Sequence, residues 1–178
     1  MSKIDLSLKL ISKKRVSLFI DAANILYSQQ SLGWRIDYRK LKKYFKDNAS
    51  LKKAYFYSGK ISGNNKQENF FKLMKKFGYL VKTKEVKWIK DSNGKILKGK
   101  GNLDVELALD LTHTASDFDT AILLSGDSDF ASAVSFIKSL GKIVIVISSR
   151  NHISRELINV ADLYLPFDKL KKYIKRSS

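Results

Sequence analysis

The apolar run Ala121–Leu124 constrains the fold more than any other stretch, because it ends abruptly in a turn that carries carboxylates. This turn, Ser125–Asp129, contains Asp127 and Asp129, and an apolar helical pattern follows through Phe130–Ile137. A strand that is apolar on both faces and leads into a crossover helix is typical of a parallel sheet covered on both sides. Ligands of such sheets bind outside the carboxyl ends of the strands. The two carboxylates therefore either cap the following helix or belong to a ligand site.

The rest of the chain repeats this alternation of short apolar runs and amphipathic helical patterns. It predicts one α/β domain, a three-layer α/β/α sandwich with a mostly parallel, Rossmann-like central sheet. We expect a lead-in at residues 1–14, the domain at 15–167 and a basic C-terminal helix or tail at 168–178. The predicted strands are residues 16–20, 54–57, 79–83, 120–124, 142–147 and 163–165, and the predicted helices include 67–77, 104–113, 129–139 and 153–160.

Residues 84–100 have a different character, with six lysines and Trp88. Asp91–Gly94 lies between two apolar stretches and is a strong hairpin turn signal. We expect a basic hairpin inserted near 84–100. One interpretation is an arm that grips phosphates, with an aromatic ring available for base stacking. The other is a solvated, charged loop.

Charge favours a polyanionic partner. The chain has 34 Lys and Arg against 17 Asp and Glu, a net charge of +17, and such a surface attracts nucleic acid. It has no cysteine, which excludes disulfides and thiolate metal sites. With no signal-peptide pattern and no apolar run of about 18 residues, we expect a cytoplasmic protein with no membrane association.

One segment breaks the basic pattern, because residues 101–137 contain no Lys or Arg. An acidic island inside a basic chain is what a hydrolase needs if cations must bind where phosphates arrive. Its acids are Asp104, Glu106, Asp110, Asp117, Asp119, Asp127 and Asp129.

Four carboxylates are candidates for one site. Asp21 ends the first predicted strand, Asp104 lies in the first turn of the helix before the central strand, and Asp127 and Asp129 follow that strand. Carboxylates that converge repel one another unless a cation neutralises them, and oxygen ligands suit Mg²⁺ or Mn²⁺. Each of these residues could also simply cap a helix.

Three motifs together resemble the NYN domain, the LabA-like branch of the PIN-like nucleases. They are Ile20–Asn24, Lys100–Asp110 and Leu124–Phe130, and the resemblance runs from about Arg15 to Phe167. It implies a PIN-like fold and metal-dependent cleavage of RNA, with Mg²⁺ or Mn²⁺ as cofactor. The acidic positions of that family are matched by Asp21, Asp104, Asp127 and Asp129, which would be both catalytic and metal-binding.

The resemblance also implies roles for other residues. Asn24 matches an Asn that would orient a carboxylate or water. Asp110 also matches, but six helical residues place it about 120° around the helix from Asp104, so we treat it as structural. Apart from the resemblance, the residues themselves suggest substrate contacts: Ser125 and Gly126 at the helix N-terminus, with Lys100, Trp88, Arg150, Asn151 and Ser154 further out. For Arg150, Asn151 and Ser154, the polarity of a surface loop is an equally good explanation.

Three functions remain open at this stage. The first is a ribonuclease acting on single-stranded or structured RNA. The second is a PIN-like RNA-binding or regulatory module with little or no activity. The third is a dimeric scaffold whose basic surface meets an acidic protein, and a homodimer is also compatible with the first two.

Overall fold

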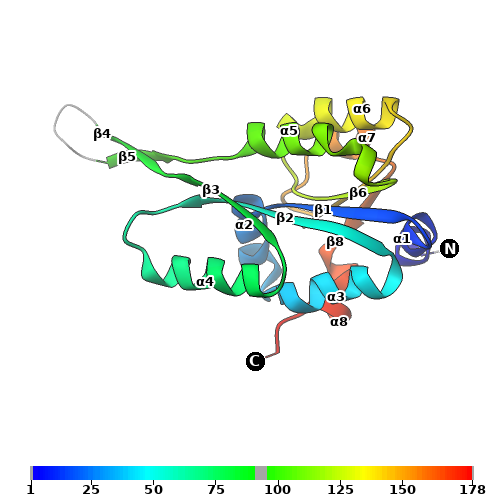
Figure 1. The fold of residues 1–178 in the computed structure, drawn as a ribbon, viewed down its shortest axis with the longest axis horizontal. Helices are drawn as coiled ribbons and strands as arrows, with labels where there is room; N and C mark the ends of the chain where they lie inside the picture. Colours follow the sequence, from blue (N-terminus) through cyan, green and yellow to red (C-terminus); the bar gives the residue numbers. More distant parts are fainter. Residues whose placement is uncertain (1, 91–95, 178) are drawn as a thin grey trace.

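The computed structural model describes the backbone of residues 2–90 and 96–177, and the side chains of these residues except those of 89, 90 and 96–100. The centre of the fold is a six-stranded sheet (Figure 1). The strand order is β3-β2-β1-β6-β7-β8, and every neighbouring pair is parallel. The strands are β1 (Arg15–Asp21), β2 (Ser50–Lys60), β3 (Leu80–Glu85), β6 (Thr120–Leu124), β7 (Ile143–Ser148) and β8 (Leu163–Pro166).

Helices cover both faces of this sheet, so the three-layer α/β/α sandwich is confirmed (Figure 1). One face packs against α1 (Lys3–Ile11), α2 (Ala22–Leu32), α3 (Tyr38–Asn48), α4 (Asn65–Lys76) and α8 (Phe167–Ile174). The other packs against α5 (Asp104–His113), α6 (Ala131–Ser139) and α7 (Arg155–Val160). Among the described residues, no helix combines the length and the apolar character that crossing a membrane requires.

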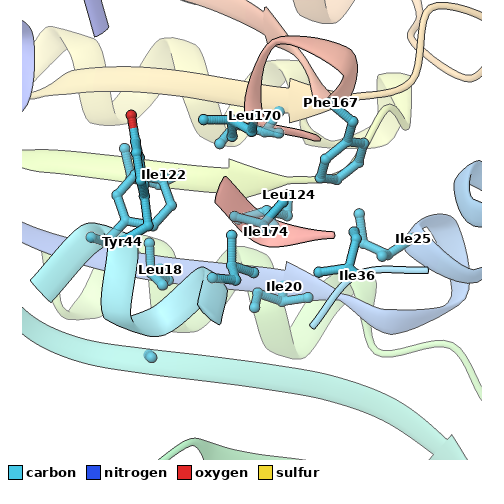
Figure 2. Packing of buried hydrophobic residues seen from close by; sticks show 14 of the residues in the cluster. Leu18, Ile20, Ile25, Ile36, Tyr44, Ile122, Leu124, Phe167, Leu170 and Ile174 are labelled. Atoms are coloured by element: carbon cyan, nitrogen blue, oxygen red, sulfur yellow. The ribbon is translucent and has the colours of Figure 1, made fainter. Parts of the chain in front are cut away.

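Alternation along the strands divides the core into two clusters. In β1, Leu18 and Ile20 point into the cluster under α3 and α8, while Phe19 points into the cluster under α5 and α6. Figure 2 shows the first cluster, where Phe167 and Leu170 of α8 pack over the sheet. Side chains of a strand alternate between faces, so a run that is apolar throughout must be covered on both.

The order of the strands reverses between β1 and β6: β2 and β3 are added on one side of β1, and β6, β7 and β8 on the other. The connections β1-β2 and β2-β3 run through helices of the first face, and β6-β7 and β7-β8 run through α6 and α7 on the second. The strands on either side of such a switch point leave a crevice at their carboxyl ends, where α/β proteins bind ligands. Asp21 ends β1, and the acidic turn follows β6, so both predicted carboxylate segments lie at this crevice.

Strand and helix ends differ from the sequence prediction where exposure hides the pattern. Strand β2 has eleven residues instead of the four predicted at 54–57, because only those four are buried. Residues 128–130 form a 3₁₀ turn, and α6 begins at Ala131 instead of at residue 129. The basic insertion pairs β4 (Lys87–Lys90) antiparallel with β5 (Ile96–Lys100), as a hairpin requires. Its expected turn at 91–94 lies outside the described residues.

Candidate metal centre

Three carboxylates from two separate segments meet at the crevice. Asp104, Asp127 and Asp129 each offer an oxygen, and these three atoms lie within 4.8 Å of one another. Asp104 is the first residue of α5, whereas the other two belong to the turn after β6. Within that turn, the backbone N–H of Asp129 donates to Asp127 Oδ1 over 3.1 Å. Asp127 thus caps the turn with one oxygen, which confirms the capping interpretation and leaves its role as a metal ligand a prediction.

Asp21, the fourth predicted carboxylate, lies behind this group and is not one of the three. Its side chain is buried, with the residue 8% exposed, at the end of β1. Oδ1 accepts the Asn24 N–H at 3.2 Å, which caps α2, and Oδ2 accepts the Ser125 hydroxyl at 3.0 Å. The same hydroxyl accepts the N–H of Asp127 at 3.2 Å. Asp21 is therefore connected through Ser125 to the acidic turn.

The electrostatics of the cluster disfavour its own negative charge. Partial burial, followed by the charges of Asp21, Asp127 and Asp129, raises the pKa of Asp104 from 3.8 to about 6, and a hydrogen bond from Asn102 opposes the change. Burial also raises the pKa of Asp21, against the hydrogen bonds from Asn24 and Ser125. A cation bound at the three oxygens would relieve this repulsion.

The other acidic residues of 101–137, the segment without Lys or Arg, form ion pairs with basic residues elsewhere in the chain. Among the described residues, no ion pair involves Asp104, Asp127 or Asp129. The remaining four are paired as Glu106–Lys84 (2.8 Å), Asp110–Lys82 (2.6 Å), Asp117–Lys53 (2.7 Å) and Asp119–Arg15 (2.7 Å). Asp110 also accepts the Tyr57 hydroxyl at 2.8 Å, in keeping with a structural role. As far as the structure describes their surroundings, the seven acids therefore separate into a cluster without a basic partner and four structural ion pairs.

Gly126 allows the acidic turn to sit against the loop after β7. A Cβ at this position would collide with the backbone carbonyl of His152, so only glycine fits. The Gly126 N–H donates to Asn24 Oδ1 at 2.9 Å, and its carbonyl accepts the N–H of Ser154 at 2.9 Å. Asn24, expected to orient a carboxylate or water, holds the backbone of this turn in place.

Two of the expected substrate contacts have structural tasks. Ser125 is fully buried, and its hydroxyl is engaged with Asp21 and Asp127. The hydroxyl of Ser154 accepts the Leu157 N–H at 3.2 Å and caps α7. Asn102 is not among the predicted site residues, yet its side-chain amide donates to Asp104 Oδ2. Its position in the Lys100–Asp110 motif, two residues before Asp104, is the feature of the sequence that points to it.

The outer substrate candidates form no hydrogen bond or ion pair with the three carboxylates among the side chains that the structure describes. Arg150 is exposed in the loop after β7 and lies 3.7 Å from Asp168, and Asn151 is exposed beside it. Trp88 is 48% exposed on β4. Lys100 ends β5, and its side chain lies outside the described residues. Figure 1 shows β4 and β5 extending away from the body of the sheet.

A three-layer sandwich with a parallel sheet and an acidic cluster at its switch point is consistent with a PIN-like domain, and comparison with known proteins places the chain in a family of that type. The NYN domain model matches residues 15–168, and the chain belongs to this family. It is similar to the Low amplitude and bright protein LabA of Synechococcus elongatus, with 32% identity over 92% of this chain and 89% of that protein. It also resembles the crystal structure of a Vibrio parahaemolyticus protein of unknown function, with a TM-score of 0.76 and 26% identity over 91% of this chain and 96% of that one.

Proposed function

We propose that this protein is a metal-dependent ribonuclease. The observation that carries the proposal is the group formed by Asp104, Asp127 and Asp129, whose oxygens lie within 4.8 Å of one another in a basic chain. Membership of the NYN family, a branch of the PIN-like nucleases, makes phosphodiester hydrolysis the reaction class that fits such a group.

The donor set fits a hard divalent cation. All three groups are carboxylates, which are ligands that Mg²⁺ and Mn²⁺ prefer. Asp104, Asp127 and Asp129 would hold the ion directly, and Asp21 would support them with its charge and its bond to Ser125. Such an ion lowers the pKa of water and neutralises charge that develops on the phosphate.

The residues of the chain supply position and ionisation state. With its pKa at about 6, Asp104 is mostly ionised at neutral pH and is ready to act as a ligand. Ser125 ties Asp21 to the backbone of Asp127, and Asn24 ties α2 to Gly126. These bonds fix the distance between β1 and the acidic turn before any substrate arrives, which limits the reorganisation that the reaction needs.

RNA is the proposed substrate because of charge and family. The net charge of +17 attracts a polyanion, and residues 101–137 give the site no lysine or arginine that would compete with a cation. A homodimer stays a prediction that sedimentation of the purified protein can test. An acidic protein partner stays a prediction that a gel shift against RNA at two salt concentrations can test.

The test is cleavage of labelled single-stranded RNA by purified protein with Mg²⁺, with Mn²⁺ and with EDTA. We expect cleavage of the RNA with either metal and no cleavage with EDTA. The cleavage rate of Asp127→Asn should be lower than that of the wild type by about 100-fold or more. Asp47→Asn is the matched control, since Asp47 lies on α3 and pairs with Lys43. Intact RNA in all conditions would refute the nuclease. Salt-sensitive binding without cleavage would instead favour an RNA-binding module.

A further inference from the structure

A solvent-open cavity of about 890 Å³ lies on the face of the sheet covered by α2 and α4. This volume is in the range of binding sites for small organic molecules. The walls come from α2, α4, the segment between α2 and α3, and the end of β2. Six aromatic side chains line it: Trp34, Tyr38, Phe56, Phe70, Phe71 and Phe77.

The cavity reaches the edge of the sheet that carries the carboxylates. Ala22, one of its lining residues, directly follows Asp21 at the start of α2. Ser58, another lining residue, follows Tyr57, which is the register partner of Asp21 in β2. A strand of nucleic acid lying along the carboxyl ends of β6, β1 and β2, which are neighbours in the sheet, would therefore pass the acidic turn after β6 and then the cavity.

The aromatic wall is held in place by its own packing. Tyr38 meets Phe56 edge-to-face at 5.4 Å between ring centroids and meets Phe70 at 5.9 Å. Trp34 is 6% exposed, so its ring is fixed in the wall. Phe70 and Phe77 are only partly covered, so these two rings of the wall are accessible as stacking partners for a planar base, with little dependence on sequence.

Two arginines, Arg35 and Arg176, are among the residues that line the cavity. Both are exposed, and the Arg176 N–H donates to the Arg35 carbonyl at 2.8 Å. Neither guanidinium forms an ion pair with a residue that the structure describes. Asp37, an acid in the lining, is occupied in capping α3 through the Lys40 N–H. Arginine is well suited to bind phosphate, because its planar group offers paired donors.

We propose that this cavity binds a nucleobase of single-stranded RNA, with Arg35 and Arg176 holding the adjoining phosphates. Aromatic walls alone would fit many apolar molecules, but two arginines on a chain of net charge +17 select a ligand that is both planar and polyanionic. The proposal rests on RNA being the substrate of the neighbouring carboxylates, and it makes the substrate class single-stranded, since bases in a duplex are not free to enter.

The experiment uses Trp34 as the reporter. The full chain has two tryptophans, so Trp88→Phe leaves Trp34 alone, and Asp127→Asn is added to prevent cleavage. Short oligoadenylate is titrated into this double variant, and we expect a saturable quench of Trp34 fluorescence. Adding Leu73→Asp, at a 44% exposed lining position on α4, should weaken binding by at least ~10-fold by repelling the phosphates.

Leu140→Asp is the matched control, because Leu140 is 48% exposed at the end of α6 on the opposite face. Its affinity for oligoadenylate should stay unchanged. An equal loss in both variants would overturn the proposal, as would an equal quench by inorganic polyphosphate, which has the charge but no bases. Oligoadenylate affinity that Leu73→Asp leaves unchanged, measured with a labelled oligomer by fluorescence anisotropy, refutes the cavity alone when the wild type cleaves RNA. A saturable quench without wild-type cleavage refutes the nuclease alone.

Discussion

The carboxylate of Asp104 carries a charge that the folded protein disfavours, so removing that charge should stabilise the protein without metal. Its pKa is raised from 3.8 to about 6 by partial burial and by the charges of Asp21, Asp127 and Asp129. Asp104→Asn keeps the shape of the side chain and an oxygen that can still accept the bond from Asn102. The variant therefore removes the charge and little else.

The magnitude follows from the change in pKa. A difference between 3.8 and about 6 corresponds to about 3 kcal/mol once the carboxyl is fully ionised. Asp104 is only partly buried, so solvent screening reduces the usable stabilisation to about 1 kcal/mol. In a domain of this size, that raises the midpoint of thermal unfolding by about 2–4 °C.

The effect has a defined pH window. The folded-state pKa of Asp104 is higher than the unfolded one, so the penalty is absent below pH 3.8 and complete above about 6. Thermal unfolding followed by circular dichroism in EDTA should show the gain of Asp104→Asn at pH 7.5. The gain should shrink at pH 4.5. Added Mn²⁺ should stabilise the wild type but not the variant, which reverses their order.

Asp47→Asn is the control for this measurement, because Asp47 forms an exposed i,i+4 pair with Lys43 and should gain nothing on losing its charge. The reasoning is refuted if Asp104→Asn unfolds at a lower temperature than the wild type at pH 7.5 in EDTA. A gain of the same size at pH 4.5 would equally show that the charge of Asp104 is not its source.

Three further predictions concern the support of the site and one distant ion pair. Gly126→Ala should cost about 3 kcal/mol in urea unfolding, since its methyl group meets the backbone of the loop after β7. Ser125→Ala leaves Asp21 with one bond fewer, and we expect a loss of about 1–3 kcal/mol together with weaker Mn²⁺ binding by calorimetry. The Arg15 guanidinium lowers the pKa of Asp119 to about 2. Asp119→Asn should therefore lower the melting temperature slightly at pH 6, and this difference should fade as the pH drops below 3.8 towards 2.

The position of the site could be predicted from the sequence, because two apolar strands end at carboxylates and parallel strands end on one edge. The structural role of each residue in the site could not be predicted in this way. Ser125 is a small polar residue in an exposed-looking turn, yet its hydroxyl is buried against Asp21. Burial of this kind results from the close contact of Gly126 with the loop after β7, a contact between segments far apart in the chain.

The aromatic cavity was hidden from the sequence for a related reason. The stripe formed by Phe70, Phe71, Met74 and Phe77 has helical spacing and reads as ordinary core. In the structure Phe71 and Met74 are buried, whereas Phe70 and Phe77 are only partly covered, and all three phenylalanines line the cavity. Periodicity shows which face of a helix is apolar, but the distance between α4 and α2 decides whether that face is filled.

The sequence by itself determined the layers and the three motifs, because apolar periodicity and turn chemistry are local properties of the chain. The order of the strands, and with it the switch point between β1 and β6, was decided by the tertiary structure. The tertiary structure decided which acids of residues 101–137 meet one another. Four of them pair with bases that lie 22 to 104 positions away, and three are left facing each other at the end of β6. Spacing along one helix cannot encode this division, since it depends on which strand lies beside α5. The acidic turn after β6 becomes a candidate metal centre only because the fold leaves it without a basic neighbour among the described residues.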